Sequence, residues 1–152
     1  MKLNAVRTLV CAALATSGFS AYSQCHSPIY GIASDAGQGV IHKLDEYTGQ
    51  SLSNSIALYD SAAIALDKAS QRLYYVSVPQ NNGHSYLAYY DINSGSHHQV
   101  GKTKFTYRLV SDPSQNLLWA AHDDTLFTID PTTGYVAIYG ELTGFRNEQD
   151  KN

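Results

Sequence analysis

The segment Leu126-Phe127-Thr128-Ile129-Asp130-Pro131-Thr132-Thr133-Gly134 decides how this sequence folds, because it joins a strand to a specific turn. Its first four residues are apolar, β-branched or aromatic, which is typical of a β-strand. The Asp, Pro and Gly that follow favour a tight turn, in which the Asp side chain accepts hydrogen bonds from backbone N–H groups two residues on. Weaker copies of this strand and turn occur at Leu44-Asp45-Glu46-Tyr47-Thr48-Gly49 and at Tyr90-Asp91-Ile92-Asn93-Ser94-Gly95.

These copies belong to a longer repeat. Asp67 and Asp112 are 45 residues apart, as are Leu73 and Leu118, and Ile29 precedes Leu73 by 44 residues. The turns themselves are 46 and 39 residues apart, because the loop at 79–85 shortens to 122–124 in the next copy. A period of about 45 residues that contains four short strands indicates a β-propeller blade.

We therefore predict an all-β, β-propeller-like fold with about two and a half to three four-stranded antiparallel blades, at 29–58, 62–101 and 107–144. The first copy lacks its opening strand, and no segment has the sustained 3.6-residue period of a helix. A β-sandwich is the alternative for many short strands, but it does not explain the repeat. Since propellers usually have about four to eight blades, we expect that the ring is not closed within this chain, and that further blades come from additional sequence or from other copies.

The N-terminal 23 residues have the pattern of a secretory signal peptide. Lys2 and Arg7 precede an uncharged run at 8–15, and small residues end the segment at Ala21 and Ser23. A buried N-terminal helix is the alternative reading, whereas the run is too short to span a bilayer. We expect export through the secretory pathway to the periplasm or the cell exterior, a partial propeller at 24–146 and a polar tail at 147–152.

The charge and the cysteine content of the expected mature chain limit the classes of partner that it could bind. Of 10 basic and 13 acidic residues, the signal peptide removes two basic ones, which leaves a net charge of −5 and no basic cluster. This argues against nucleic acid or an anionic membrane as a partner, and no later segment is long and apolar enough to cross a membrane. Cys25 is then the only thiol, which suggests an intermolecular bond, a partner in additional sequence or an unused thiol.

The run at 126–134, with Ala65-Leu66-Asp67 or Val110-Ser111-Asp112-Pro113 before the next Leu-Tyr or Leu-Trp, resembles the blades of bacterial secreted propellers. These include the YVTN-type, quinoprotein-like and lactonase-like groups, and the resemblance covers nearly all of 29–144. It implies a fold rather than a reaction, because such blades occur in cofactor-binding, hydrolytic and non-catalytic proteins. The chain has no Trp-Asp pair of the WD40 kind and no kelch Gly-Gly pair. Its single Trp119 departs from the repeated tryptophans of the quinoprotein class.

The candidate chemical residues favour structural roles. His97 and His98 are adjacent in a strand and would point to opposite faces, so they could not easily share a metal ion. The sequence His122-Asp123-Asp124 could ligate a metal, but Asp-Asp is ordinary turn chemistry, and His26, His42 and His84 are expected to be solvated. Asp45, Asp91 and Asp130 recur because the turn needs them. We predict no catalytic, cofactor-binding or metal-binding residues and no cofactor.

Twelve tyrosines are the one compositional excess. In strands they are expected to fill the spaces between blades: Tyr74, Tyr75, Tyr89, Tyr90, Tyr107 and Tyr139. Tyr86 and Tyr135 lie near turns, where tyrosine suits a half-apolar binding surface. The function predicted is an exported binding or scaffolding module for an unknown protein or carbohydrate ligand, with self-association as a further expectation. The alternative is part of a propeller enzyme, a lactonase-like hydrolase or a lyase, with its active site in the central channel.

Overall fold

The computed structural model describes residues 29–35 and 37–143. The expected signal peptide, Cys25, His26 and the polar tail lie outside these residues. The described part of the chain forms strands and no helix, and therefore contains no helix that could cross a membrane. The strands are β1 (Ile29–Asp35), β2 (Gln38–Leu44), β3 (Ser51–Ile56), β4 (Ser61–Asp67), β5 (Arg72–Ser77), β6 (Ser85–Asp91), β7 (Ser96–Thr103), β8 (Arg108–Asp112), β9 (Leu117–His122), β10 (Thr125–Ile129) and β11 (Val136–Glu141).

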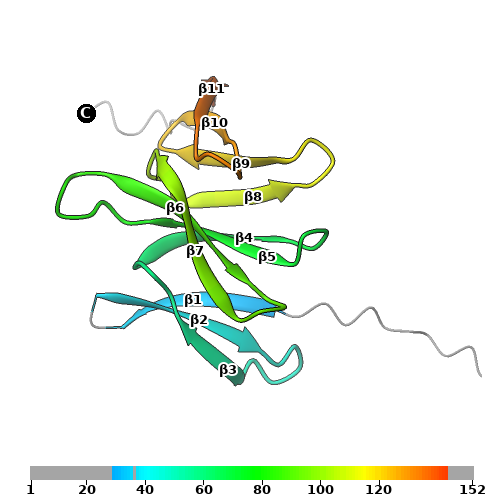
Figure 1. The fold of residues 1–152 in the computed structure, drawn as a ribbon. Helices are drawn as coiled ribbons and strands as arrows, with labels where there is room; N and C mark the ends of the chain where they lie inside the picture. Colours follow the sequence, from blue (N-terminus) through cyan, green and yellow to red (C-terminus); the bar gives the residue numbers. More distant parts are fainter. Residues whose placement is uncertain (1–28, 36, 144–152) are drawn as a thin grey trace, which may run out of the picture.

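The strands form three antiparallel sheets in which neighbours in sequence pair (Figure 1). The first sheet is β1-β2-β3, the second is β4-β5-β6-β7 and the third is β8-β9-β10-β11. The repeated Asp turn precedes the last strand of every sheet, so β1 corresponds to β5 and β9. No described residue forms the opening strand of the first sheet. The prediction of an all-β fold with about two and a half to three blades is confirmed.

The second and third sheets repeat each other in register. Ala65 pairs with Tyr74, and 45 residues later Val110 pairs with Trp119. A β-bulge interrupts the pairing of β6 with β7 after Leu87, and another interrupts that of β10 with β11 after Leu126, which is 39 residues further on. Because register fixes the face on which each side chain lies, equivalent positions of the two sheets point the same way.

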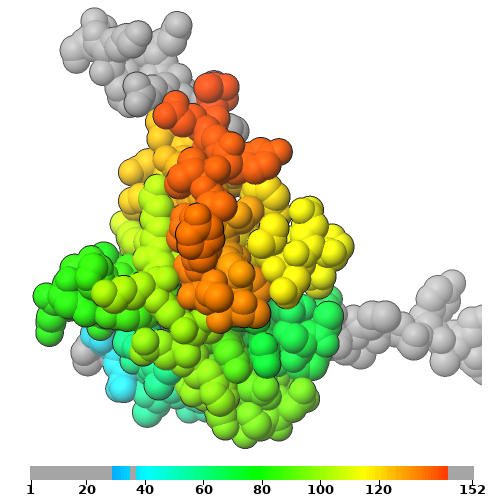
Figure 2. Space-filling view, turned by 45° about the horizontal axis from the view of Figure 1, so that its top comes forward, coloured from blue at the N-terminus to red at the C-terminus, as the bar shows by residue number. Residues whose placement is uncertain are grey.

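The sheets are stacked face to face, which accounts for strands that are apolar on both sides. Successive residues of β5 point to opposite faces. Leu73 and Tyr75 contact the first sheet, whereas Tyr74 and Val76 contact the third. The core between the second and third sheets is Tyr74, Val76, Leu87, Leu118, Ala120, Phe127 and Ile129, and the core between the first and second is Ile41, Ala57, Leu73, Tyr75 and Ala88. Figure 2 shows the C-terminal strands, in orange, above the green second sheet.

In each of the two four-stranded sheets, a buried hydroxyl forms hydrogen bonds at the start of the first strand. The Ser61 Oγ donates towards the carbonyl oxygens of Val76 at 2.7 Å and Ala63 at 3.0 Å. Thr106 lies 45 residues later and makes the equivalent contacts, to Ala121 at 2.6 Å and Arg108 at 2.8 Å. This pair was not predicted from the sequence. The signal was present as two hydroxyl residues at the repeat spacing, each two positions before the start of the regular pairing, at Ala63 in β4 and at Arg108 in β8.

The face of the third sheet that points away from the second sheet is uncovered within the described residues. On it, Val110 is 59% exposed and Tyr139 is 72% exposed, and Tyr139 contacts Trp119 edge-to-face. Tyr139 was predicted to lie between blades, and that prediction was wrong because it lies on this outward face. Val100 is the residue of the second sheet that is equivalent to Tyr139, and it packs into the core against the third sheet. The three sheets do not close a ring.

Candidate functional site

The two ends of the stacked sheets differ in chemistry. Antiparallel strands alternate in direction, so successive hairpin connections lie at opposite ends. One end, here called the turn end, carries the connections 45–50, 67–71, 91–95, 112–116 and 130–134. The other, the aromatic end, carries 57–60, 78–84, 104–107 and 122–124. Figure 1 shows the β2–β3 and β8–β9 turns on the right and the β5–β6 loop on the left.

The turn end is built from carboxylates that are already occupied by hydrogen bonds. The Asp130 Oδ1 accepts from the backbone N–H groups of Thr132 at 2.7 Å and Thr133 at 3.1 Å, and from the Thr132 hydroxyl at 2.6 Å. The Thr132 hydroxyl and these N–H groups lower the pKa of Asp130. Asp45 and Asp91 accept the same pair of backbone donors, and their pKa values are also lowered. The predicted structural role of the three repeated aspartates is confirmed.

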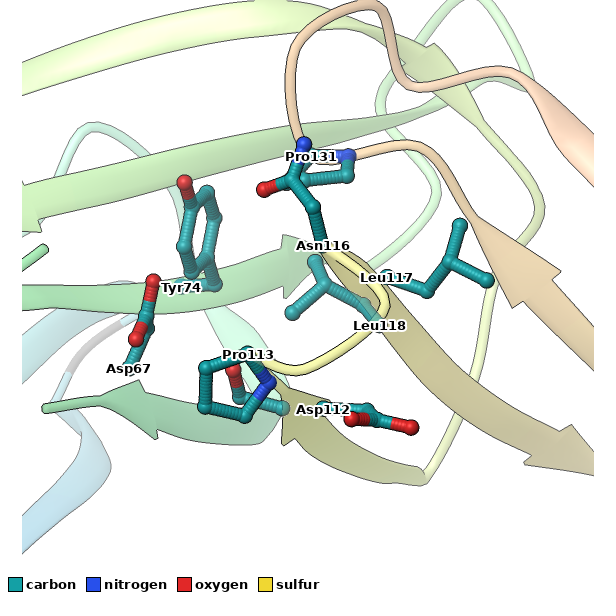
Figure 3. Close-up of a pocket in the computed structure, with 9 residues that line it drawn as sticks. Asp67, Tyr74, Asp112, Pro113, Asn116, Leu117, Leu118 and Pro131 are labelled. Carbon is teal, nitrogen blue, oxygen red and sulfur yellow. The ribbon is translucent and has the colours of Figure 1, made fainter. Parts of the chain in front are cut away.

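Two more aspartates, Asp67 and Asp112, end the strands β4 and β8 and line a small pocket between the second and third sheets. Figure 3 shows the Asp67 carboxylate beside Tyr74, and Asp112 on the other side of Pro113 with its carboxylate pointing away from Tyr74. The Asp67 carboxylate accepts from Ala69 N–H and the Ser70 hydroxyl. The pocket has a cavity volume of about 10 Å³, which is room for about one water molecule and far below the roughly 300–1,000 Å³ of typical ligand sites.

Asp112 is held in the same way as Asp67. It accepts from Ser114 N–H and hydroxyl and from the Gln115 amide, and the Ser114 hydroxyl is the main cause of its lowered pKa. Both carboxylates of the pocket are therefore committed to their own turns. They have the geometry of strand-ending turns rather than of an acid–base pair.

The aromatic end contains two clusters of rings. In the first, Tyr59 from the β3–β4 connection is stacked on Tyr86, with ring centroids 5.6 Å apart and an interplanar angle of 16°. The Tyr59 hydroxyl donates to Gln99 Oε1, and Asn82 Nδ2 donates to the Tyr86 hydroxyl at 2.7 Å. Partial burial raises the pKa of Tyr59. This cluster ties the β5–β6 loop to the connection from the first sheet.

The second cluster joins the β7–β8 connection to the end of β9. The rings of Phe105 and Tyr107 meet edge-to-face at 4.7 Å, and Tyr107 stacks on His122 at 5.4 Å with an angle of 30°. The His122 Nε2 lies 3.6 Å from Asp123 Oδ2, whereas its Nδ1 is buried without a hydrogen-bond partner. Tyr107 is 58% exposed. It was predicted to fill the space between blades and instead covers the aromatic end, because it precedes β8 rather than lying within it.

The histidines are dispersed over the described residues. His97 and His98 point to opposite faces of β7 as predicted, since His97 contacts Tyr90 and His98 stacks on Tyr89. His84 is exposed. His42 is partly buried, and its Nδ1 lies 3.0 Å from the Ser51 hydroxyl in an exposed contact. Within 29–35 and 37–143, no three His, Cys, Asp or Glu side chains are grouped so that they could hold a metal ion.

Comparison with known proteins supports the fold. No protein-family model matches the sequence, and no curated protein matches it. Among solved structures, the chain is similar to one in "Crystal structure of Nidogen/Laminin Complex", with a TM-score of 0.54 and 9% sequence identity over 75% of this chain. That neighbour is a β-propeller. This chain has the fold of a partial propeller. It spans 45% of the length of the propeller chain that it matches.

Proposed function

We propose that this chain is a non-catalytic, exported propeller module that binds another protein through its aromatic end. The observation that carries the proposal is the difference between the two ends. The turn end presents aspartates that saturate their own turns, and its exposed tyrosines, Tyr47 and Tyr135, lie in separate turns. The aromatic end instead gathers rings from neighbouring connections into two clusters, which include Tyr59 and Tyr107. Aromatic residues are enriched at the centres of protein interfaces, where they combine apolar area with a polar group.

The structural neighbour gives independent support at the level of the fold. Its printed title describes a complex of nidogen with laminin, so a propeller related in fold takes part in a protein–protein complex. Export is proposed from the charged, apolar and small-residue order of 1–23.

Matched tyrosine substitutions test which end binds. The isolated chain would be immobilised and exposed to an extract and the culture medium of the producing cells, and bound proteins would be quantified by mass spectrometry. Tyr107→Ser should reduce capture of a specific partner at least tenfold, whereas Tyr135→Ser should not, because Tyr135 is also exposed but lies at the turn end. Loss of capture with Tyr135→Ser alone, or with neither variant, would contradict the proposal.

Export has its own test. Mass spectrometry of the protein recovered from outside the cytoplasm should show a chain that begins at Gln24. A chain that retains residues 1–23 would contradict export by this signal but would leave the proposed binding surface untouched.

A further inference from the structure

His97 connects the first and second sheets through both of its ring nitrogens. It lies on β7, and its Nε2 is 2.8 Å from the Ser55 hydroxyl on β3. Its Nδ1 is 3.1 Å from the hydroxyl of Tyr75 on β5. The imidazole also packs on the ring of Tyr90, with centroids 4.8 Å apart. One side chain therefore contributes to the contact between two sheets that share no backbone hydrogen bonds in their ladders.

The hydrogen atoms of this network can be assigned from its donors and acceptors. Tyr75 is fully buried, and its hydroxyl oxygen accepts from the backbone N–H of Leu58 at 3.1 Å. The hydroxyl hydrogen is then available for His97 Nδ1. A neutral imidazole carries one donor and one acceptor nitrogen, so Nε2–H donates to Ser55. Each polar atom between Leu58 and Ser55 has a partner in this arrangement.

A second proton on His97 would disrupt this arrangement of hydrogen-bond donors and acceptors. Nδ1 would become a donor, so two hydrogens would point into the 3.1 Å space between Nδ1 and the Tyr75 oxygen. Tyr75 cannot relieve the conflict by losing its own hydrogen, because burial raises its pKa to about 12. The hydroxyl would have to turn away or the sheets would have to separate. Either outcome leaves a buried polar group without a partner, which is unfavourable.

We propose that neutral His97 fastens the first sheet to the second, and that protonation of His97 releases the first sheet as the pH falls below neutrality. The inference goes beyond the proposed binding function and does not depend on it. Leu58 and Tyr59 are consecutive in the connection between the sheets, so release would also move one member of the first ring cluster at the aromatic end.

The surroundings of His97 determine the direction of the effect. The titratable groups that face it are Tyr75 on β5 and Tyr90 on β6, while β3 contributes the uncharged Ser55. His98 is its neighbour along the same strand but points to the opposite face. Burial, with a smaller contribution from His98, lowers the pKa of His97 from 6.5. The unfolded or released state therefore binds the proton more readily, and stability is lost as the pH falls from about 6.5 towards the lower folded value.

Hydrogen exchange in the full chain tests the proposal. Protection of amides in β1–β3, corrected for the intrinsic rate, should fall by up to about tenfold per pH unit within this window, while protection in β8–β11 should stay unchanged. In His97→Gln this difference between the sheets should disappear. In His98→Gln, a matched change on the opposite face of the same strand, it should remain.

A second measurement tests the proposal without a variant, in case His97→Gln does not fold. In the unsubstituted protein, an NMR titration should show the Leu58 amide shifting at the same pH as the His97 ring. Equal loss of protection in all three sheets, abolition of the effect by His98→Gln alone, or titration of His97 without a response at Leu58 and β1–β3 would each overturn the proposal.

Discussion

Ser61 and Thr106 lie 45 residues apart and make the same two hydrogen bonds, each to the carbonyl two residues further on and to one in the second strand of its sheet. Thr106 is fully buried, so its hydroxyl is part of the interior. The repeat is therefore preserved at the level of individual hydrogen bonds, although the two residues differ in identity.

Replacing Thr106 by Val should destabilise the protein by about 1–3 kcal/mol, because the carbonyls of Ala121 and Arg108 would lose a buried donor while the shape is nearly kept. The free energy of unfolding in urea measures the effect. Thr106→Ser is the control, since it keeps the hydroxyl and should recover most of the stability. Equal stability of Thr106→Val and the unsubstituted protein would contradict the assigned role.

Stability should also fall at acidic pH through the repeated aspartates. The pKa of Asp130 is lower in the folded protein than its ordinary 3.8, so the unfolded chain binds protons more readily below that value. The stabilisation is present above about pH 4 and is lost as the pH falls through the folded pKa. Unfolding of Asp130→Asn should therefore depend less on pH below about 4, and a slope equal to that of the unsubstituted protein would exclude this contribution.

Gly134 should tolerate no side chain. Its φ is +79°, and a Cβ there would lie 2.7 Å from the Lys102 carbonyl oxygen. Gly49 has a similar φ of +68° but open space around the Cβ position, whereas Gly140 has open space and no positive φ. Alanine should thus cost least at 140, about 1 kcal/mol at 49 from the backbone conformation, and more at 134. Thermal unfolding of the three variants checks this order.

The outward face of the third sheet should mediate self-association of the chain that begins at Gln24. Val110 and Tyr139 are exposed there, while their equivalents in the second sheet are covered by the third. Sedimentation should show concentration-dependent association, and the chain should bind a hydrophobic dye. The double substitution Val110→Lys and Tyr139→Lys should reduce both, whereas Tyr135→Lys at the turn end should not. A monomeric, dye-silent parent chain would contradict this account.

Much of the fold could be predicted because the turns repeat as well as the strands. The repeated Asp–Gly turn, as at Asp130 and Gly134, predicted where the last strand of each sheet begins. The spacing of Leu73 from Leu118 aligned β5 of the second sheet with β9 of the third. Periodicity also predicted that His97 and His98 lie on opposite faces. These are local properties of the backbone and of the alternation of side chains along a strand.

The predictions that failed concern which sheet or side chain lies against each face of a sheet. Tyr139 has the sequence pattern of a residue between blades, but no described sheet covers its side. Tyr107 was assigned to a strand although it precedes β8 and joins the ring cluster with His122. The His97 network was also missed, because it brings together Ser55 and Tyr75 from different sheets. Such contacts depend on stacking between repeats, which strand periodicity within one repeat does not encode.

The order of stacking is the central claim, and side-chain NOEs in the full chain test it most directly. Methyl-labelled Leu87 should show NOEs to Phe127 or Ile129 of the third sheet, and Leu73 should show NOEs to Ile41 of the first sheet, as expected from the two cores. NOEs that join the first sheet to the third, as in a two-layer sandwich, would contradict the account.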